Sequence, residues 1–255
     1  MSAIDPVAAG GFASAAGHYA KVRPAYAREA IGVLQEVVPP GIVLDVGAGT
    51  GILTGQLERA GRSLHAVEPL SEMLVHLRRS LPGTPAVVAS GEAMPLRGEL
   101  YSGVTIAQAF HWMDPRRTLG EVSRVLRQGG VLALMWNVRD ESVPWVGELT
   151  DLVEERTGGR PYTDHRDRDW NDVVDHEGGF EHLGDHRWSN PIPTTRDGVV
   201  ERVRSTSYVA LLDEGEREQL IVDARRLLAE DRDLAGQDSF DYPHHTVMHL
   251  WRRAR

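Results

Sequence analysis

The sequence of 255 residues contains no cysteine. Disulfide bonds and thiolate metal sites are therefore excluded. Long apolar runs are also missing, since no stretch approaches the roughly 18 apolar residues of a membrane span. The N-terminus shows neither the basic region nor the apolar core of a secretion signal, so we expect a cytoplasmic protein without a membrane partner.

Basic residues are fewer than acidic residues. Lysine and arginine number 28 against 37 acidic residues, which leaves a net charge of −9. This balance argues against non-specific binding to nucleic acid or to an anionic membrane. We expect no metal site, because His182 and His186 fall in a predicted strand, where a spacing of four does not bring two ligands together.

Short apolar strands and helical patterns alternate through the first half of the chain. The pattern predicts strands at 42–46, 63–67, 86–88, 103–107 and 131–136, and helices at 26–38, 51–60, 71–80 and 115–126. Such alternation is typical of a parallel sheet that helices cover on both faces. The predicted fold is therefore α/β, with a doubly wound, Rossmann-like sheet.

The pattern changes beyond residue 137. Helices are predicted at 144–156, 196–204 and 214–228, and strands at 180–192 and 242–252. We expect these two strands to complete a seven-stranded, mostly parallel sheet as an antiparallel C-terminal hairpin, with the helices as a cap. Three parts follow: residues 1–40 as an N-terminal lid and first helix, 41–138 as the Rossmann-like core, and 139–255 as the cap helices with the last two strands of the sheet.

A glycine-dense turn, VLDVGAGTG at residues 43–51, ends the first strand, and Glu68 ends the second. Gly47 allows a sharp turn, while Gly49 and Gly51 let the backbone approach a ligand and let the next helix pack closely. Glu68 follows Gly47 by 21 positions (68 − 47), the usual distance for a carboxylate that accepts hydrogen bonds from ribose hydroxyls. Glycine turns also occur in α/β domains that bind nothing.

The glycine spacing distinguishes between nucleotide ligands. A dinucleotide fingerprint needs glycine at position 52, where this chain has Ile52. A P-loop needs Gly-Lys-Ser/Thr, which does not follow. The pattern here is G-x-G-x-G.

Five motifs together resemble the class I S-adenosylmethionine-dependent methyltransferases, in particular the small-molecule group that includes trans-aconitate methyltransferase and UbiE-like enzymes. The resemblance covers roughly residues 19 to 137. The motifs are VLDVGAGTG (43–51), VEP (67–69), SGEAMPL (90–96), AQAFHW (107–112) and RVLRQGG (124–130). Weaker similarity extends into STSYVA (205–210).

The resemblance implies an enzyme that binds S-adenosyl-L-methionine, releases S-adenosyl-L-homocysteine and methylates a small molecule, with specialised metabolism as its expected context. We expect a monomer or a homodimer. The residues expected to bind the cofactor are Tyr19, Arg23, Asp45, Gly47, Ala48, Gly49, Thr50, Gly51, Glu68, Pro69, Met73, Gly91, Glu92, Ala93, Gln108, Ala109, Phe110 and Trp112.

Aromatic side chains near a cationic sulfonium are favourable, so Tyr19, Phe110 and Trp112 are candidates for that contact. Packing in the core is the alternative for Phe110 and Trp112. His111 is the candidate catalytic residue, because the carboxyl end of a strand presents ligand groups and an imidazole suits a general base. The alternative for His111 is a structural histidine that is hydrogen-bonded to the backbone.

The acceptor is less defined. Candidate acceptor contacts are Trp136, Asn137, Tyr208, His244 and His245. Two positions depart from the family pattern: Ser90 stands where an aspartate often contacts adenine, and PHHT at 243–246 stands where Pro-Tyr-x-Thr is expected.

Three other functions stay open at this point. An NAD(P)-dependent oxidoreductase would use the same fold, although Ile52 argues against it. A non-catalytic protein could bind S-adenosylmethionine without transferring its methyl group. A nucleic-acid methyltransferase is disfavoured by the acidic charge and by the absence of an Asn/Asp-Pro-Pro-Tyr/Phe motif.

Overall fold

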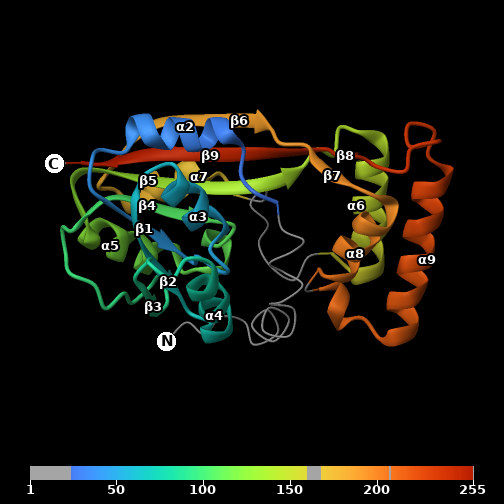
Figure 1. The fold of residues 1–255 in the computed structure, drawn as a ribbon, viewed down its shortest axis with the longest axis horizontal. Helices are drawn as coiled ribbons and strands as arrows, with labels where there is room; N and C mark the ends of the chain where they lie inside the picture. The colour runs from blue at the N-terminus through green and yellow to red at the C-terminus, as the bar shows by residue number, and fades with distance from the viewer. Residues whose placement is uncertain (1–23, 160–167, 207, 255) are drawn as a thin grey trace.

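The computed structural model describes residues 24–159, 168–206 and 208–254. A seven-stranded sheet in the described part has the order β3-β2-β1-β4-β5-β9-β6 (Figure 1). Its strands are β1 (Ile42–Val46), β2 (Ser63–Glu68), β3 (Ala86–Val88), β4 (Tyr101–Ala107), β5 (Leu126–Arg139), β6 (Phe180–Ser189) and β9 (His244–Arg253). Strand β9 is antiparallel to both β5 and β6, and the other neighbours pair in parallel. The predicted fold class is confirmed.

Helices cover both faces of this sheet (Figure 1). On one face lie α2 (Arg28–Val37), α3 (Ile52–Arg59) and α4 (Ser71–Ser80), and on the other α5 (Pro115–Val125) and α7 (Trp170–Glu177). Successive residues of β5 serve opposite faces, as alternation along a strand requires. Val131 and Met135 pack in the cluster of α2 and α3, whereas Leu132 and Trp136 pack in the cluster of α5 and α7.

Three further helices stand beyond the carboxyl end of β5 (Figure 1). They are α6 (Pro144–Thr157), α8 (Arg196–Arg204) and α9 (Glu214–Glu230). The short helix η2 (Val209–Leu211) lies between α8 and α9 in the chain. Their buried apolar residues form a cluster separate from those of the sheet. We call these elements the helical cap. In the described ranges no helix has the length and apolarity needed to cross a membrane.

Both late strands differ from their predictions at a proline. The predicted strand 180–192 divides into β6 and β7 (Ile192–Thr194) around Pro191, and the predicted strand 242–252 divides into β8 (Phe240–Tyr242) and β9 around Pro243. Proline has no backbone N–H to donate to a sheet ladder, so pairing is interrupted there. The outer pieces, β7 and β8, pair with each other in a second small sheet that leads into the helical cap.

Two other elements extend the predicted pattern. Strand β5 begins at Leu126 rather than at residue 131. Its pairing with β4 shifts register between Leu126 and Val131, and Gly129 in this stretch has a φ of +72°. Helix α7 was not predicted, since it follows a polar stretch. Asp169 caps this helix by accepting a hydrogen bond from the Asn171 N–H at 2.9 Å, and the buried Trp170 anchors it to the core.

Candidate functional site

A cavity opens at the carboxyl ends of β1, β2 and β4, where an α/β sheet presents ligand groups. Its lining joins the first turn, the end of β2 and the loops after β3 and β4. The predicted cofactor residues that line it are Asp45, Gly47, Ala48, Gly49, Thr50, Glu68, Pro69, Met73, Gly91, Glu92, Gln108, Ala109 and Trp112.

The three glycines of the first turn all have positive φ angles, which side chains rarely adopt. A Cβ on Gly47 would lie 2.6 Å from the Cβ of Ala109, and one on Gly51 would lie 3.0 Å from the Cγ of Leu77 in α4. A Cβ on Gly49 would meet nothing within 4 Å. Gly47 and Gly51 therefore allow close packing, whereas Gly49 leaves its backbone open toward the cavity.

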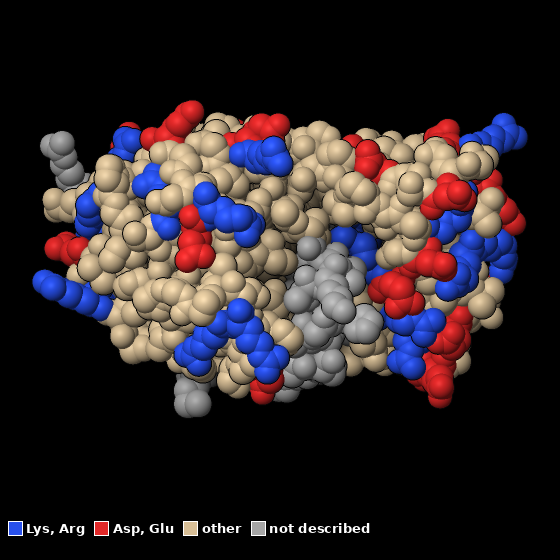
Figure 2. All heavy atoms as spheres, viewed as in Figure 1, with Lys and Arg blue, Asp and Glu red and all other residues tan. Residues whose placement is uncertain are grey.

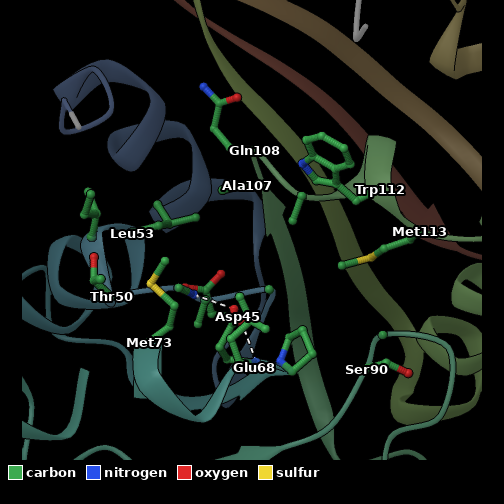
Figure 3. A pocket seen from close by; sticks show the side chains of 18 of the residues that line it. Asp45, Thr50, Leu53, Glu68, Met73, Ser90, Ala107, Gln108, Trp112 and Met113 are labelled. Carbon is green, nitrogen blue, oxygen red and sulfur yellow. Dashed lines mark hydrogen bonds between the residues drawn. The ribbon is translucent and has the colours of Figure 1, made fainter. Parts of the chain in front are cut away.

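Glu68 supports the same turn. Its Oε2 accepts a hydrogen bond from the Gly49 N–H at 2.9 Å, and its Oε1 accepts one from the Leu70 N–H at 3.0 Å (Figure 3). Each carboxylate oxygen keeps lone pairs for a further donor. Burial raises the pKa of Glu68, while the two backbone hydrogen bonds oppose that shift. The carboxylate is thus held rigidly at the cavity wall.

Asp45 is a second buried carboxylate beside Glu68. Its oxygens accept hydrogen bonds from the hydroxyls of Thr54 at 2.6 Å and Thr105 at 2.9 Å. Burial raises the pKa of Asp45 to about 6, although the Thr54 and Thr105 hydrogen bonds lower it. Asp45 is therefore largely ionised at neutral pH, which gives this side of the cavity an acidic character suited to a cation.

Apolar side chains form the opposite walls. Leu53 and Met73 lie on one side of the cavity in Figure 3, and Trp112 and Met113 lie on the other. Gln108 has an unusual backbone, with φ +55°. Its Nε2 donates to the carbonyl oxygen of Asn137 at 2.8 Å, which ties the loop after β4 to the end of β5.

Several predicted cofactor residues lie elsewhere. Gly51 packs under α4, as described above, and Ala93 is exposed outside the lining. Phe110 is fully buried in the core, edge-to-face with Trp170 at 5.4 Å between ring centroids. The core-packing alternative therefore fits Phe110, whereas Trp112 reaches the cavity. Tyr19 and Arg23 lie outside the described residues.

His111 belongs to the short helix η1 (Phe110–Trp112) but does not line this cavity. It lies instead on a separate open hollow between η1 and α7. Its Nδ1 accepts a hydrogen bond from the indole N–H of Trp136 at 3.1 Å. This is a structural contact, although its partner is the side chain of Trp136 and not the backbone that the sequence analysis named as the alternative.

Two of the predicted acceptor residues, Trp136 and Asn137, lie on β5 and make contacts within the fold. Trp136 is buried and stacks on Trp170 at 5.3 Å. Asn137 bonds to the carbonyl of Ala25 at 3.1 Å and accepts from the hydroxyl of Thr246 at 2.6 Å. Both residues therefore have structural contacts.

The other predicted acceptor residues lie where the sheet meets the helical cap. Tyr208 and His244 are buried there. His245 lies 3.7 Å from Asp140 and contacts Arg187. Burial lowers the pKa of His245 and Arg187 lowers it further, against the opposing effect of Asp140.

Sequence reasoning missed some of the lining. The residues that it did not name as cofactor contacts are Tyr26, Ile52, Leu53, Leu70, Ser90, Ala107 and Met113. Most of them directly adjoin a predicted contact in the sequence, and Leu53 lies two positions beyond Gly51. Tyr26 is more distant, and its segment reaches the cavity through a fold contact: its N–H donates to the Oε1 of Gln56 at 2.9 Å.

Comparison with known proteins identifies the family. Residues 44–134 match the model of the methyltransferase domain. An uncharacterized methyltransferase of Mycobacterium tuberculosis is 39% identical over 238 residues, covering 92% of this chain and 93% of the relative. One of Schizosaccharomyces pombe is 40% identical over 118 residues, which is 46% of this chain and 47% of the relative.

A solved structure shows the same fold. It is the structure of a protein from Anaeromyxobacter dehalogenans that is described as a type II methyltransferase. The TM-score is 0.64 at 24% sequence identity, and the match covers 91% of this chain and 97% of that one. The relatives and the fold agree with the resemblance of the sequence motifs. The chain therefore belongs to the class I S-adenosylmethionine-dependent methyltransferases.

Proposed function

We propose that this chain binds S-adenosyl-L-methionine in the cavity at the carboxyl ends of β1, β2 and β4, and methylates a small molecule there. The observation that carries the proposal is the pairing of Glu68 with the Gly49 N–H at 2.9 Å. It puts a carboxylate and a side-chain-free backbone segment on one cavity wall. That combination suits ribose hydroxyls next to a closely held nucleoside.

The residues present fit this cofactor. Gly49 leaves room at the wall, Glu68 keeps acceptor positions for ribose hydroxyls, and Leu53 and Met73 offer apolar contact for a base. The bound cofactor would supply an electrophilic methyl group on a sulfonium. Asp45 and Glu68 provide the negative potential that attracts such a cation, and the Trp112 ring adds a favourable face worth about 0.5–2 kcal/mol.

The chain's further contribution is orientation. A methyl transfer needs the acceptor nucleophile in line behind the methyl carbon, and good positioning supplies on the order of 7–11 kcal/mol. The rigid turn, with both Glu68 oxygens bound to backbone, supports such positioning. We propose that the acceptor enters from the side of the helical cap, within the part formed by residues 139–255. The net charge of −9 supports a small molecule over nucleic acid.

Calorimetry with S-adenosylmethionine and S-adenosylhomocysteine tests this proposal. We expect one binding site, and a Kd that rises about 10- to 100-fold in Glu68→Gln, because a hydrogen bond to a charged group contributes about 1.5–3 kcal/mol. Glu72→Gln is the matched control, since Glu72 lies in the exposed first turn of α4. NAD(P)H should give no heat.

Absence of binding by both forms of the cofactor would reject the proposal. Binding with no S-adenosylhomocysteine formed from any offered acceptor would favour the non-catalytic alternative. An equal Kd for wild type and Glu68→Gln would remove Glu68 from the cofactor site.

A further inference from the structure

Four polar side chains from distant parts of the chain meet the backbone just before α2. They are Gln56 of α3, Asn137 of β5, Asn190 of the link between β6 and β7, and Thr246 of β9. Each forms a hydrogen bond with the backbone of residues 24–27, and we call the four the polar clamp. Residues 24–27 belong to no helix or strand, so contacts with other segments have to hold them.

The segment that the polar clamp holds contributes to the cofactor cavity. Tyr26 lines the cavity and is only 7% exposed. Gln56 binds both backbone groups of Tyr26: its Oε1 accepts from the N–H at 2.9 Å, and its Nε2 donates to the carbonyl oxygen at 2.8 Å. The clamp thus fixes the backbone of a residue that forms part of the cavity wall.

Asn137 and Thr246 hold the residues on either side of Tyr26. The two lie opposite each other on β5 and β9, so their side chains project from the same face of the sheet. The Nδ2 of Asn137 donates to the carbonyl oxygen of Ala25 at 3.1 Å. The hydroxyl of Thr246 accepts from the Ala27 N–H at 3.0 Å and donates to the Oδ1 of Asn137 at 2.6 Å. The two side chains therefore act as one unit.

The backbone fixes the direction of these hydrogen bonds. A carbonyl oxygen only accepts and an N–H only donates. The amide nitrogen of Asn137 therefore faces Ala25, and its amide oxygen faces the hydroxyl proton of Thr246. Asn190 completes the arrangement, because its Nδ2 donates to the Ala25 carbonyl oxygen at 2.8 Å and to the Asn137 Oδ1 at 3.1 Å. Loss of one member consequently breaks more than one bond of the network.

Asn137 is also tied to a second residue of the cavity wall. The Nε2 of Gln108 donates to its carbonyl oxygen at 2.8 Å. Gln108 has a φ of +55°, a conformation that is uncommon for a residue with a side chain and needs support from its surroundings. The described lining contains Tyr26 and Gln108 but neither Asn137 nor Thr246. A residue outside the lining thus connects two residues within it.

We propose that Asn137 and Thr246 are positioning residues for methyl transfer, which keep Tyr26 at the cofactor cavity by holding the backbone on both sides of it. The proposal rests on the proposed function, because Tyr26 would be held against the proposed cofactor. A wall that is already in place binds its ligand more tightly, since no segment has to be ordered when the ligand arrives. Neither Asn137 nor Thr246 touches the cofactor, and their effect on binding passes through Tyr26.

Calorimetry with S-adenosylhomocysteine tests the effect on binding. Thr246→Val keeps the size of the buried side chain and removes its hydroxyl, and Asn137→Leu removes the amide without adding a charge. We expect each to raise the Kd by about 5-fold or more, a size typical of coupling between residues in contact. Thr246→Ser keeps the hydroxyl and should leave the Kd within about 2-fold of the wild type.

The Tyr26→Ala background separates positioning from other effects of the clamp. Tyr26→Ala alone should raise the Kd at least as much as Thr246→Val. Because the ring that the clamp positions is then absent, adding Thr246→Val should change the Kd by less than about 2-fold. A further loss as large as the one in the wild-type background would overturn the inference, since Thr246 would then act by another route.

Hydrogen exchange in the free protein tests the clamp without a ligand. Thr246→Val removes the acceptor of the Ala27 N–H, so exchange at Ala27 should be faster by about 10-fold or more. Thr246→Ser should exchange there like the wild type. Helix α9 should be unchanged in both variants, because it packs within the helical cap, and it reports that the fold is intact. An unchanged rate at Ala27 in Thr246→Val would overturn the inference.

Two further variants complete the experiment. Asn171→Ala is the matched control, since its Nδ2 also donates to another side chain, the Oδ2 of Asp185 at 2.9 Å, but lies on α7. It should change neither the Kd nor the exchange at Ala27. Asn190→Ala alters a half-buried position and should raise the Kd, so the inference stays testable if Thr246→Val does not fold.

Two failures are distinguishable. If the wild type binds S-adenosylhomocysteine but Thr246→Val and Asn190→Ala bind it with the same Kd, this inference is overturned and the proposed function stands. If the wild type does not bind S-adenosylhomocysteine, the proposed function fails and this inference fails with it.

Discussion

His111 accepts a hydrogen bond from the indole of Trp136 through Nδ1, so the proton of its neutral ring is on Nε2. A general base needs a free lone pair within reach of the acceptor. Here the Nδ1 lone pair is already used, and the side chain does not line the cofactor cavity. The geometry therefore favours a supporting role for His111.

The substitution His111→Gln distinguishes these two roles. Glutamine can still accept from the Trp136 indole through its amide oxygen, but it cannot act as a base at neutral pH. We expect kcat within a few-fold of the wild type, whereas loss of a general base would lower it by about 10²–10⁴. Methyl transfer assays at saturating cofactor measure this, and a loss of the larger size would restore His111 as the base.

Asp45 predicts a specific dependence of stability on pH. Its pKa is about 6 in the folded protein against an ordinary value of 3.8. The neutral acid is thus favoured by folding, and this contribution is present below pH 4 and lost as the pH rises through 6. The difference corresponds to about 3 kcal/mol at 1.36 kcal/mol per pKa unit.

Urea unfolding of wild type and Asp45→Asn from pH 4 to pH 7 checks this expectation. Asparagine is a neutral isostere, so the free energy of unfolding of the wild type should fall relative to the variant by up to about 3 kcal/mol across that range. Parallel curves would show that Asp45 keeps an ordinary pKa in the folded protein.

At the scale of the element, the turn between β1 and α3 depends on two separate properties of glycine. Gly51 has φ +87°, and a Cβ there would lie 3.0 Å from Leu77 of α4. Gly61 has nearly the same angle, φ +88°, but a Cβ there would meet nothing within 4 Å. Comparison of the two positions therefore separates backbone strain from crowding.

We expect Gly61→Ala to lower the free energy of unfolding by about 1–2 kcal/mol, which is the cost of a left-handed conformation for a residue with a Cβ. Gly51→Ala should lower it by a further 1–3 kcal/mol or so, because a well-packed contact must move. Urea unfolding at neutral pH measures both. Equal losses would mean that α4 yields freely to the added methyl group.

Local patterns accounted for most of the cofactor cavity, because the glycines and Glu68 stand at strand ends that the apolar pattern locates. The parallel sheet with helices on both faces was predicted from the same alternation. The breaks at Pro191 and Pro243 were not predicted, although the absence of a backbone donor is visible in the sequence. Contacts between distant segments could not be predicted, and Phe110 is an example: its place in the core depends on Trp170, 60 residues later (170 − 110).

At the scale of the whole molecule, the sheet and the helical cap have separate apolar cores. The chain passes from one of these cores to the other after β5, between β6 and β7, and between β8 and β9 (Figure 1). The described residues that line the cofactor cavity all lie between Tyr26 and Met113. The cavity proposed for the cofactor and the packing of the cap therefore involve different parts of the described chain.

Hydrogen exchange with and without S-adenosylhomocysteine tests this division. We expect slower exchange in the turn between β1 and α3, at the end of β2 and in the loop after β4, because a ligand there opposes local opening. Helix α9 should exchange at the same rate in both states, since its contacts lie within the cap. Comparable protection of α9 would mean that the cap closes when the cofactor binds. The two halves would then act as one unit before any acceptor arrives, and acceptor entry would require the cap to reopen.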